Sequence, residues 1–169
     1  MKRVFQNRIP SKENLSKRGI SAAVNCARNF ERVESSSHIL FECNIVYEVW
    51  MTICKWIEVN SVMHNECITR FDAFTKIVQR SNGTEAGLRT IWFACIWSIW
   101  KARNAKIFQD KNISALAITE QAKLLLWNWL RVKSRSFDYD ISQWMTNPIT
   151  CLETVKWMFR VPAAAGLHL

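Results

Sequence analysis

The segment that most constrains the fold is the apolar run TIWFACIWSIW, residues 90–100. Apolar side chains fall on nearly every face of a helix drawn through it, and a helix that is hydrophobic all round is buried. Its 11 residues are too few to cross a bilayer, which takes about 20. We therefore predict no membrane association, and a central helix from about residue 84 or 85 to Phe108 that carries Trp92 and Trp100 into the core.

Composition favours helices in the rest of the chain as well. Four Gly and three Pro in 169 residues are few for an all-β protein with many tight turns. With 49% hydrophobic residues, the chain is long enough to bury a core. We predict a mainly α fold, a small irregular helical domain over residues 1–152 with a knuckle-like loop near its N-terminus. Residues 153–169 stay unassigned.

Capping residues mark the first and last of these helices. Ser11 is expected to cap a short helix that stops at Gly19, and Ser114 to cap a helix that runs to about Val132. The apolar side of the later helix would comprise Leu116, Leu124, Trp127 and Leu130.

Apolar spacing predicts two further helices between them. One starts at Ser35 or Ser36 and continues past Cys43 to about residue 57, and the other spans about residues 66–80. Residues 136–150 are expected to be extended or irregular, since Pro148 disfavours helix at the residue before it.

Four positions near the N-terminus have the spacing of a metal knuckle with one ligand replaced. Cys26, His38 and Cys43 offer thiolate and imidazole ligands, which zinc prefers. Asn29 stands where a C-x2-C pair would have its second Cys, and its amide oxygen is a poor zinc ligand. We expect zinc binding to be weak or lost.

Two interpretations of these residues remain open. In one, the site has collapsed and its thiols pack as small hydrophobic groups. In the other, three ligands still hold a metal, with water or another side chain as the fourth. His64 and Cys67 form an H-x2-C pair that could supply that side chain.

The net charge of +9 is concentrated in two segments. Residues 1–32 and residues 101–135 each carry eight basic residues against two acidic ones. Such surfaces attract a polyanion by counterion release, although they also serve as solvated faces that keep a protein soluble. The candidate phosphate contacts are Lys12, Lys17, Arg18, Lys101, Arg103 and Lys106.

Nine tryptophans raise a second question, whether any of them stacks on nucleic-acid bases. Trp50, Trp92 and Trp100 follow helical spacing with other apolar residues, which favours core packing. Trp129 and Trp144 are less clearly internal, so they are the better candidates for stacking.

Catalytic motifs are missing from the sequence. Metal-dependent polymerases and ribonuclease H need clustered carboxylates, but the chain has only four Asp, and its closest pair, Asp138 and Asp140, is typical of a surface segment. There is no nucleophile elbow, Gly-rich phosphate loop or HExxH stretch. We predict that the protein is not an enzyme and has no small-molecule substrate.

Four segments taken together resemble a known family. They are RIPSKENLSKRGI (8–20), ESSSHILFECNIVYEVW (34–50), IWFACIWSIWKARNAKIF (91–108) and NPITCL (147–152). Their order resembles the zinc-binding domain that follows the reverse transcriptase in polyproteins of plant LINE-type (non-LTR) retrotransposons. With Asn29 at a ligand position and the family's upstream part missing, the chain looks like an N-terminally truncated, degenerate copy.

The resemblance implies a non-catalytic accessory module that binds RNA or DNA beside a polymerase. The alternative is a vestigial or protein-interaction helical domain without nucleic-acid affinity. Six Cys without a secretion signal favour a nuclear or cytoplasmic protein with reduced thiols.

Overall fold

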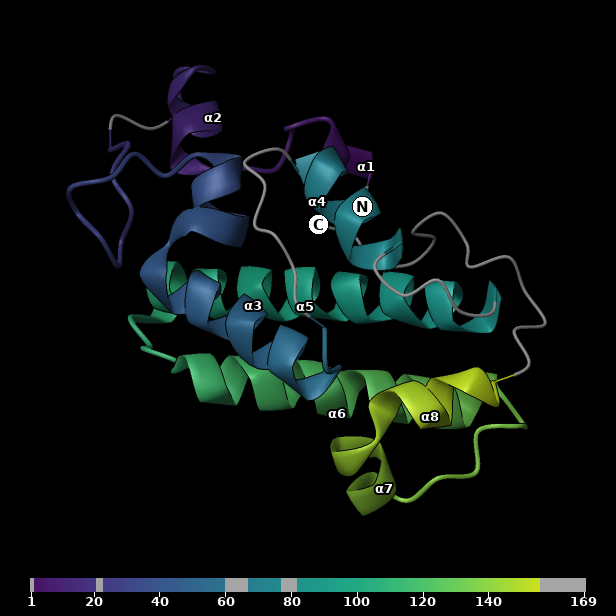
Figure 1. The fold of residues 1–169 in the computed structure, drawn as a ribbon. Coiled ribbons are helices and arrows are strands. Elements are labelled where there is room, and N and C mark those ends of the chain that lie inside the picture. Colours follow the sequence, from purple (N-terminus) through teal and green to yellow (C-terminus); the bar gives the residue numbers. More distant parts are fainter. Residues whose placement is uncertain (1, 21–22, 60–66, 77–81, 156–169) are drawn as a thin grey trace.

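The computed structural model describes residues 2–20, 23–59, 67–76 and 82–155 (Figure 1). Over these residues the chain is helical and contains no β-strand, apart from one isolated bridge between Asn25 and Val33. The predicted mainly α fold is confirmed. In chain order the elements are α1 (Lys2–Phe5), α2 (Lys12–Ser16), the π-helical turn η1 (His38–Glu42), α3 (Asn44–Trp56), α4 (Cys67–Lys76), α5 (Asn82–Gln109), α6 (Ala115–Lys133), α7 (Ile141–Thr146) and α8 (Pro148–Glu153).

Helix α5 is the central helix, as predicted from its apolar run. Figure 1 shows α6 lying antiparallel beside α5 after a short loop; α4 packs against α5, and α3 packs against α6. Helix α8 and the turn η1 also pack against α5. Gly87 permits the approach of α8, because a Cβ there would lie 2.8 Å from a side-chain carbon of Leu152.

An aromatic cluster fills the space between α3, α4 and α5. The ring centroids of Trp50 and Trp92 lie 4.6 Å apart, and both rings also contact Phe41 and Phe74. Trp50 donates from Nε1 to the carbonyl oxygen of Leu40 at 2.8 Å. The predicted burial of Trp50, Trp92 and Trp100 is confirmed.

The predicted helix caps are also confirmed. The Ser11 hydroxyl accepts from the backbone N–H of Asn14, and the Ser114 hydroxyl accepts from that of Ala117, each at 3.2 Å. After α2 the chain turns at Gly19, whose φ of 71° is in the left-handed region that favours glycine.

Three local predictions are wrong. The helix expected to run past Cys43 is interrupted there, because Cys43 has extended backbone (φ −62°, ψ 134°) between η1 and α3. Residues 136–140 have no regular structure, as predicted, but residues 141–150 include α7 and the start of α8. On α6, Leu116 and Leu124 are exposed, whereas Leu130 is buried and Trp127 half-buried as predicted; the buried side also carries Ala115, Ile118, Ala122 and Leu126.

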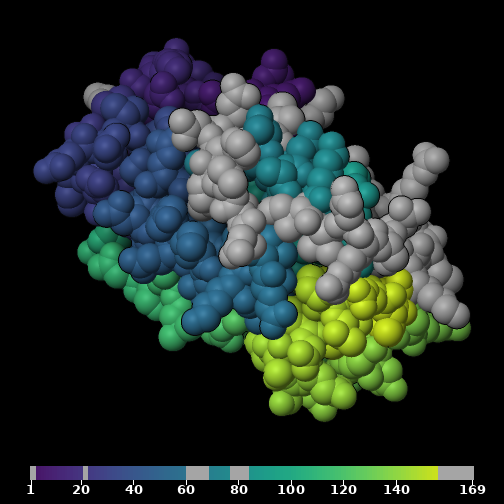
Figure 2. Space-filling view, in the orientation of Figure 1, coloured from purple at the N-terminus to yellow at the C-terminus, as the bar shows by residue number. Residues whose placement is uncertain are grey.

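Asp140 and Pro148 explain the unexpected helices. Asp140 caps α7 in a capping box with Gln143, in which each side chain accepts from the other residue's backbone N–H at 2.8 and 3.1 Å. Pro148 occupies the first position of α8, where a missing N–H costs nothing. Figure 2 shows α7 and α8 at the opposite end of this face from the N-terminal segment.

The backbone conformation at the C-terminal end of α3 can be tested by substitution. Glu58 has a φ of 55° there, in a Schellman motif with Glu58 N–H donating to Lys55 and Val59 N–H to Cys54. Glu58→Gly is therefore expected to stabilise the protein by about 0.5–1 kcal/mol, measured by chemical denaturation. The control Glu48→Gly, in the middle of α3, is expected to destabilise it by about 1 kcal/mol. A loss of stability in Glu58→Gly would contradict the assigned backbone conformation.

Candidate metal centre and basic surface

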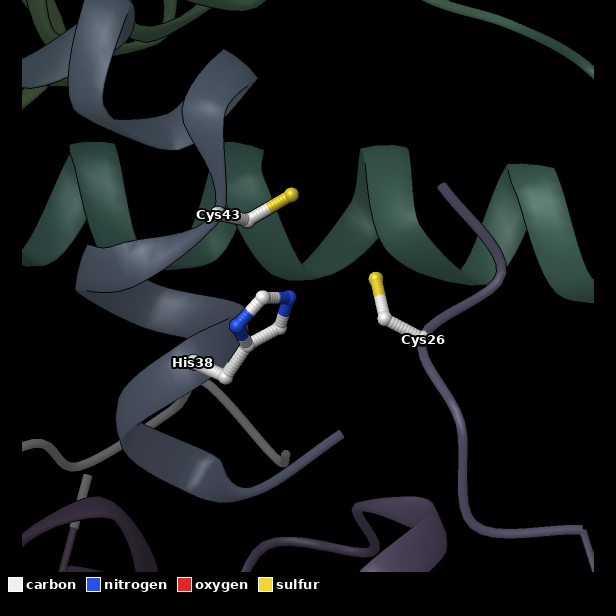
Figure 3. A group of neighbouring side chains, drawn as sticks. All are labelled: Cys26, His38 and Cys43. Carbon is white, nitrogen blue, oxygen red and sulfur yellow. The ribbon is translucent and has the colours of Figure 1, made fainter. Parts of the chain in front are cut away.

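The side chains of Cys26, His38 and Cys43 lie close together, although each residue belongs to a different kind of backbone segment (Figure 3). Cys26 lies in the loop after α2, His38 begins the turn η1, and Cys43 is the extended residue before α3. All three are buried, and their ligand atoms lie within 4.8 Å of one another. Ligand atoms around a tetrahedral zinc lie roughly 3.3–3.8 Å apart, so a contraction of at most about 1.5 Å would bring these three into place.

The loop around Cys26 has the backbone of a metal knuckle. The sulfur of Cys26 accepts from the backbone N–H of Arg28 at 3.4 Å and also from that of Asn29. Backbone bonds between Cys26 and Arg32, and between Glu34 and Val24, each 2.8 Å long, close the loop as a short hairpin. The loop around Cys26 therefore has a knuckle-like backbone, with Asn29 at the position where the sequence pattern would place a further ligand.

The imidazole of His38 fits a metal at this position. Figure 3 shows its far ring nitrogen turned toward the two sulfur atoms. That nitrogen, Nε2, is buried and has no hydrogen-bond partner within the described parts of the chain. A buried polar atom without a partner is costly, and a bound metal would satisfy it.

The two thiols are hydrogen-bonded to each other. The hydrogen bond from Cys43 lowers the pKa of Cys26, against the effect of burial. The same bond, together with burial, raises the pKa of Cys43. Burial lowers the pKa of Arg28, while the charges of Cys43 and Cys26 oppose that shift. The arrangement favours a thiolate at Cys26, and a metal would displace the proton of Cys43.

Asn29 does not join the ligand group in this structure. Its side-chain oxygen accepts from the backbone N–H of Glu31 at 3.3 Å, which closes a turn inside the loop. His64 and the side chain of Cys67, the other candidates for a fourth ligand, lie outside the described residues.

A buried ion pair joins this loop to the central helix. Arg103 donates to Glu34 at 2.5 Å, and the Glu34 side chain is 1% exposed. Glu34 also accepts from the backbone N–H of Lys12 at 3.1 Å, while the Arg28 guanidinium donates to the carbonyl of Ala102 at 3.1 Å. Sequence reasoning missed Glu34, because its partner lies 69 positions away and no local pattern marks the pair.

The six predicted phosphate contacts differ in their environments. Arg103 is buried against Glu34 and stacks over Trp100, so its charge is not presented to solvent. Lys12 donates to the carbonyl of Asn25 at 2.8 Å. Lys17 pairs with Glu13 and Lys106 with Asp110, whereas Arg18 and Lys101 are exposed.

Toward its C-terminal end, one face of α5 is less covered by the other described helices than the rest of the helix. Between Ile91 and Trp100 all side chains are buried except those of Phe93 and Trp97, which are half-buried. The same line continues at steps of four, three and four residues, which keeps it on one helical face. We call this line the α5 stripe; it comprises Trp97, Lys101, Asn104 and Phe108. Because α5 is apolar on nearly all sides, its sequence does not indicate which face is exposed to solvent. The α5 stripe was therefore not predicted.

The tryptophans expected to be available for stacking differ as well. Trp144 is fully buried, and its Nε1 donates to the carbonyl of Lys123 at 3.0 Å. Its ring packs edge-on against Trp56 and Phe137. The expectation that Trp144 is less internal is therefore wrong, while Trp129 is half-buried against the core.

Comparison with known proteins supports a zinc-binding role for the loop around Cys26, residues 24–34, which we call the metal-binding loop. Residues 1–50 match the model of a family described as zinc-binding in reverse transcriptase. No curated protein and no solved structure matches the chain significantly. The matched part contains all three ligand residues and ends at Trp50 in α3. Over these residues the resemblance to a reverse-transcriptase-associated zinc-binding domain is confirmed, and with it the expectation that zinc is a possible cofactor. None of the helices within the described ranges is long and apolar enough to cross a membrane.

Proposed function

We propose that the protein is a non-catalytic accessory module that binds RNA, derived from the reverse transcriptase polyprotein of a plant LINE-type retrotransposon. The observation that carries the proposal is the α5 stripe, in which an exposed lysine stands between aromatic side chains on one helical face. Proteins that bind single strands without sequence preference combine such cations with aromatic rings on which bases stack.

The exposure of Lys101 suits a phosphate contact, and the exposure of Phe108 suits base stacking. Lys101 is exposed and forms no ion pair with any described residue, so it is free to meet a phosphate. Phe108 is 76% exposed, although a phenyl ring is more stable when it is removed from water. This exposure leaves the face of the ring accessible to a base. Lys111 lies close along the chain and adds to the positive charge at this end of α5, whereas Lys106 is paired with Asp110.

The metal-binding loop supports the same end of the helix. Through Arg28 and Glu34 it is bonded to Ala102 and Arg103, the residues that follow Lys101. When bound, zinc would hold the loop closed by joining Cys26 to His38 and Cys43. We therefore assign the metal a structural role in the module, and assign the RNA contacts to α5.

A salt titration tests this function. Binding of single-stranded RNA, followed by fluorescence anisotropy, is expected to show log affinity falling linearly with log salt and little preference among sequences. Lys101→Gln should reduce the slope by about 0.7, the amount expected for one phosphate contact on a single strand. Phe108→Ala should weaken binding by about 5- to 150-fold, as expected for a loss of 1–3 kcal/mol of stacking.

Two matched controls locate the surface. Lys55→Gln and Tyr47→Ala remove an exposed cation and an exposed aromatic ring from α3, and both should leave RNA binding unchanged. Arg103 is left intact, because its loss would test the buried ion pair rather than the surface. No measurable binding at about 50 mM salt would favour the alternative, a vestigial or protein-interaction domain.

A further inference from the structure

A small cavity adjoins the candidate metal centre. Its volume is about 20 Å³, and it is lined by both Cys26 and Cys43, together with Arg28, Glu34 and Arg103. A cavity needs about 10–15 Å³ to hold one water molecule. His38 is not part of the lining, so the cavity adjoins the centre from the side of the two sulfur atoms.

No protein group of the knuckle takes the place of the missing ligand. The Asn29 oxygen is held by the Glu31 N–H, and the backbone amides of Arg28 and Asn29 already donate to the Cys26 sulfur. Three ligands leave a tetrahedral zinc with one open position, which is the arrangement of catalytic rather than structural zinc sites.

The charges around the cavity suit a solvent molecule or a small anion. Two thiolates and a neutral imidazole would already balance the charge of Zn²⁺. The Arg28 guanidinium donates to a neutral carbonyl, so its charge is not matched by a carboxylate there. The Nε of Arg103 is buried and has no hydrogen-bond partner in the described part of the molecule. The charge of Arg103 is paired with Glu34, so Arg28 is the group that favours an electron-rich ligand beside the sulfur atoms.

We propose that zinc bound here has only three protein ligands, and that its fourth position is held by a water molecule in this cavity and exchanges with small monodentate anions. The proposal rests on the zinc binding inferred for residues 1–50. It concerns the coordination of the ion and is independent of whether the α5 stripe binds RNA.

Cobalt(II) substitution tests the open position without an activity assay. The wild-type protein loaded with Co²⁺ should show the intense visible bands of a tetrahedral thiolate site, and added azide should shift these bands in a saturable way. Asn29→Cys supplies a third thiolate from the knuckle position. It should bind Co²⁺ at least about 100-fold more tightly, since even outer-shell partners change affinity by 10–100-fold, and its bands should not respond to azide.

The control Asn128→Cys adds a thiol at an exposed position of α6 and should behave as the wild type does. X-ray absorption on the zinc-loaded wild type gives a second measurement, with two sulfur and two nitrogen or oxygen neighbours expected. Three sulfur neighbours, or tight cobalt binding without an azide response, would show a closed site and overturn the proposal. So would a wild type that binds no cobalt while Asn29→Cys does. RNA binding of the same samples decides the proposed function separately.

Discussion

Trp50→Ala and Trp92→Ala are each expected to destabilise the protein by roughly 3–5 kcal/mol, the cost of truncating a large buried aromatic side chain. Both rings are almost fully buried, and their centroids are only 4.6 Å apart. Each also contacts Phe41 and Phe74, and these rigid rings cannot easily fill the cavity that a truncation would leave. The midpoint of chemical denaturation measures the loss.

Substitution by Phe separates packing from hydrogen bonding in the same cluster. Trp50 donates from its indole N–H to Leu40, while the indole N–H of Trp92 is buried without a partner in the described regions. Trp50→Phe should therefore cost about 1–3 kcal/mol more than Trp92→Phe, because it leaves a buried carbonyl unsatisfied. Equal costs would contradict the hydrogen bonding described for these two rings.

Glu34→Leu is expected to cost about 3–5 kcal/mol, because it leaves the Arg103 guanidinium buried without its carboxylate. The loss includes the bond from the Lys12 backbone N–H, which holds the start of α2. Denaturation should show the change, and the metal-binding loop should loosen with it, since Glu34 closes that loop against α5.

A double variant provides the control for this ion pair. Replacing a buried pair by apolar residues of similar volume is often nearly neutral, so Glu34→Leu combined with Arg103→Met should recover most of the lost stability. If Glu34→Leu alone were as stable as the wild type, Arg103 would have to reach solvent, and the buried ion pair would be refuted.

Local signals explain which parts of the fold could be predicted. The apolar run defines α5, and Ser114 marks the start of α6, because periodicity and capping act within a few residues. Asp140 and Gln143 carried the signal for α7 in their spacing, but Pro148 was interpreted as a barrier to helix rather than as the first residue of one.

The faces of the helices were harder to predict than their positions. Leu116 and Leu124 are exposed on α6, although side chains of the same size, Leu126 and Leu130, are buried on its other side together with Ala115 and Ala122. Which side is buried depends on the helices that α6 packs against, and the sequence of one helix does not contain that information.

The candidate metal centre was also predictable only in part. Spacing alone identified Cys26, His38 and Cys43, because metal ligands recur at short, regular intervals. The break at Cys43 was not predicted, since the helical apolar pattern continues through it. The ion pair of Glu34 and Arg103 joins residues 69 positions apart, and only the folded chain brings them together.

Cys43 makes two kinds of interaction that no other residue of the candidate metal centre combines. Its sulfur faces the metal position, and its carbonyl accepts from the N–H groups of Val46 and Tyr47 in the first turn of α3. Two turns along α3 from Cys43 stands Trp50, in the aromatic cluster. We therefore expect metal occupancy and the order of that cluster to be coupled through the first two turns of α3, and such coupling is reciprocal. A variant that tightened the cluster would raise metal affinity without altering any ligand.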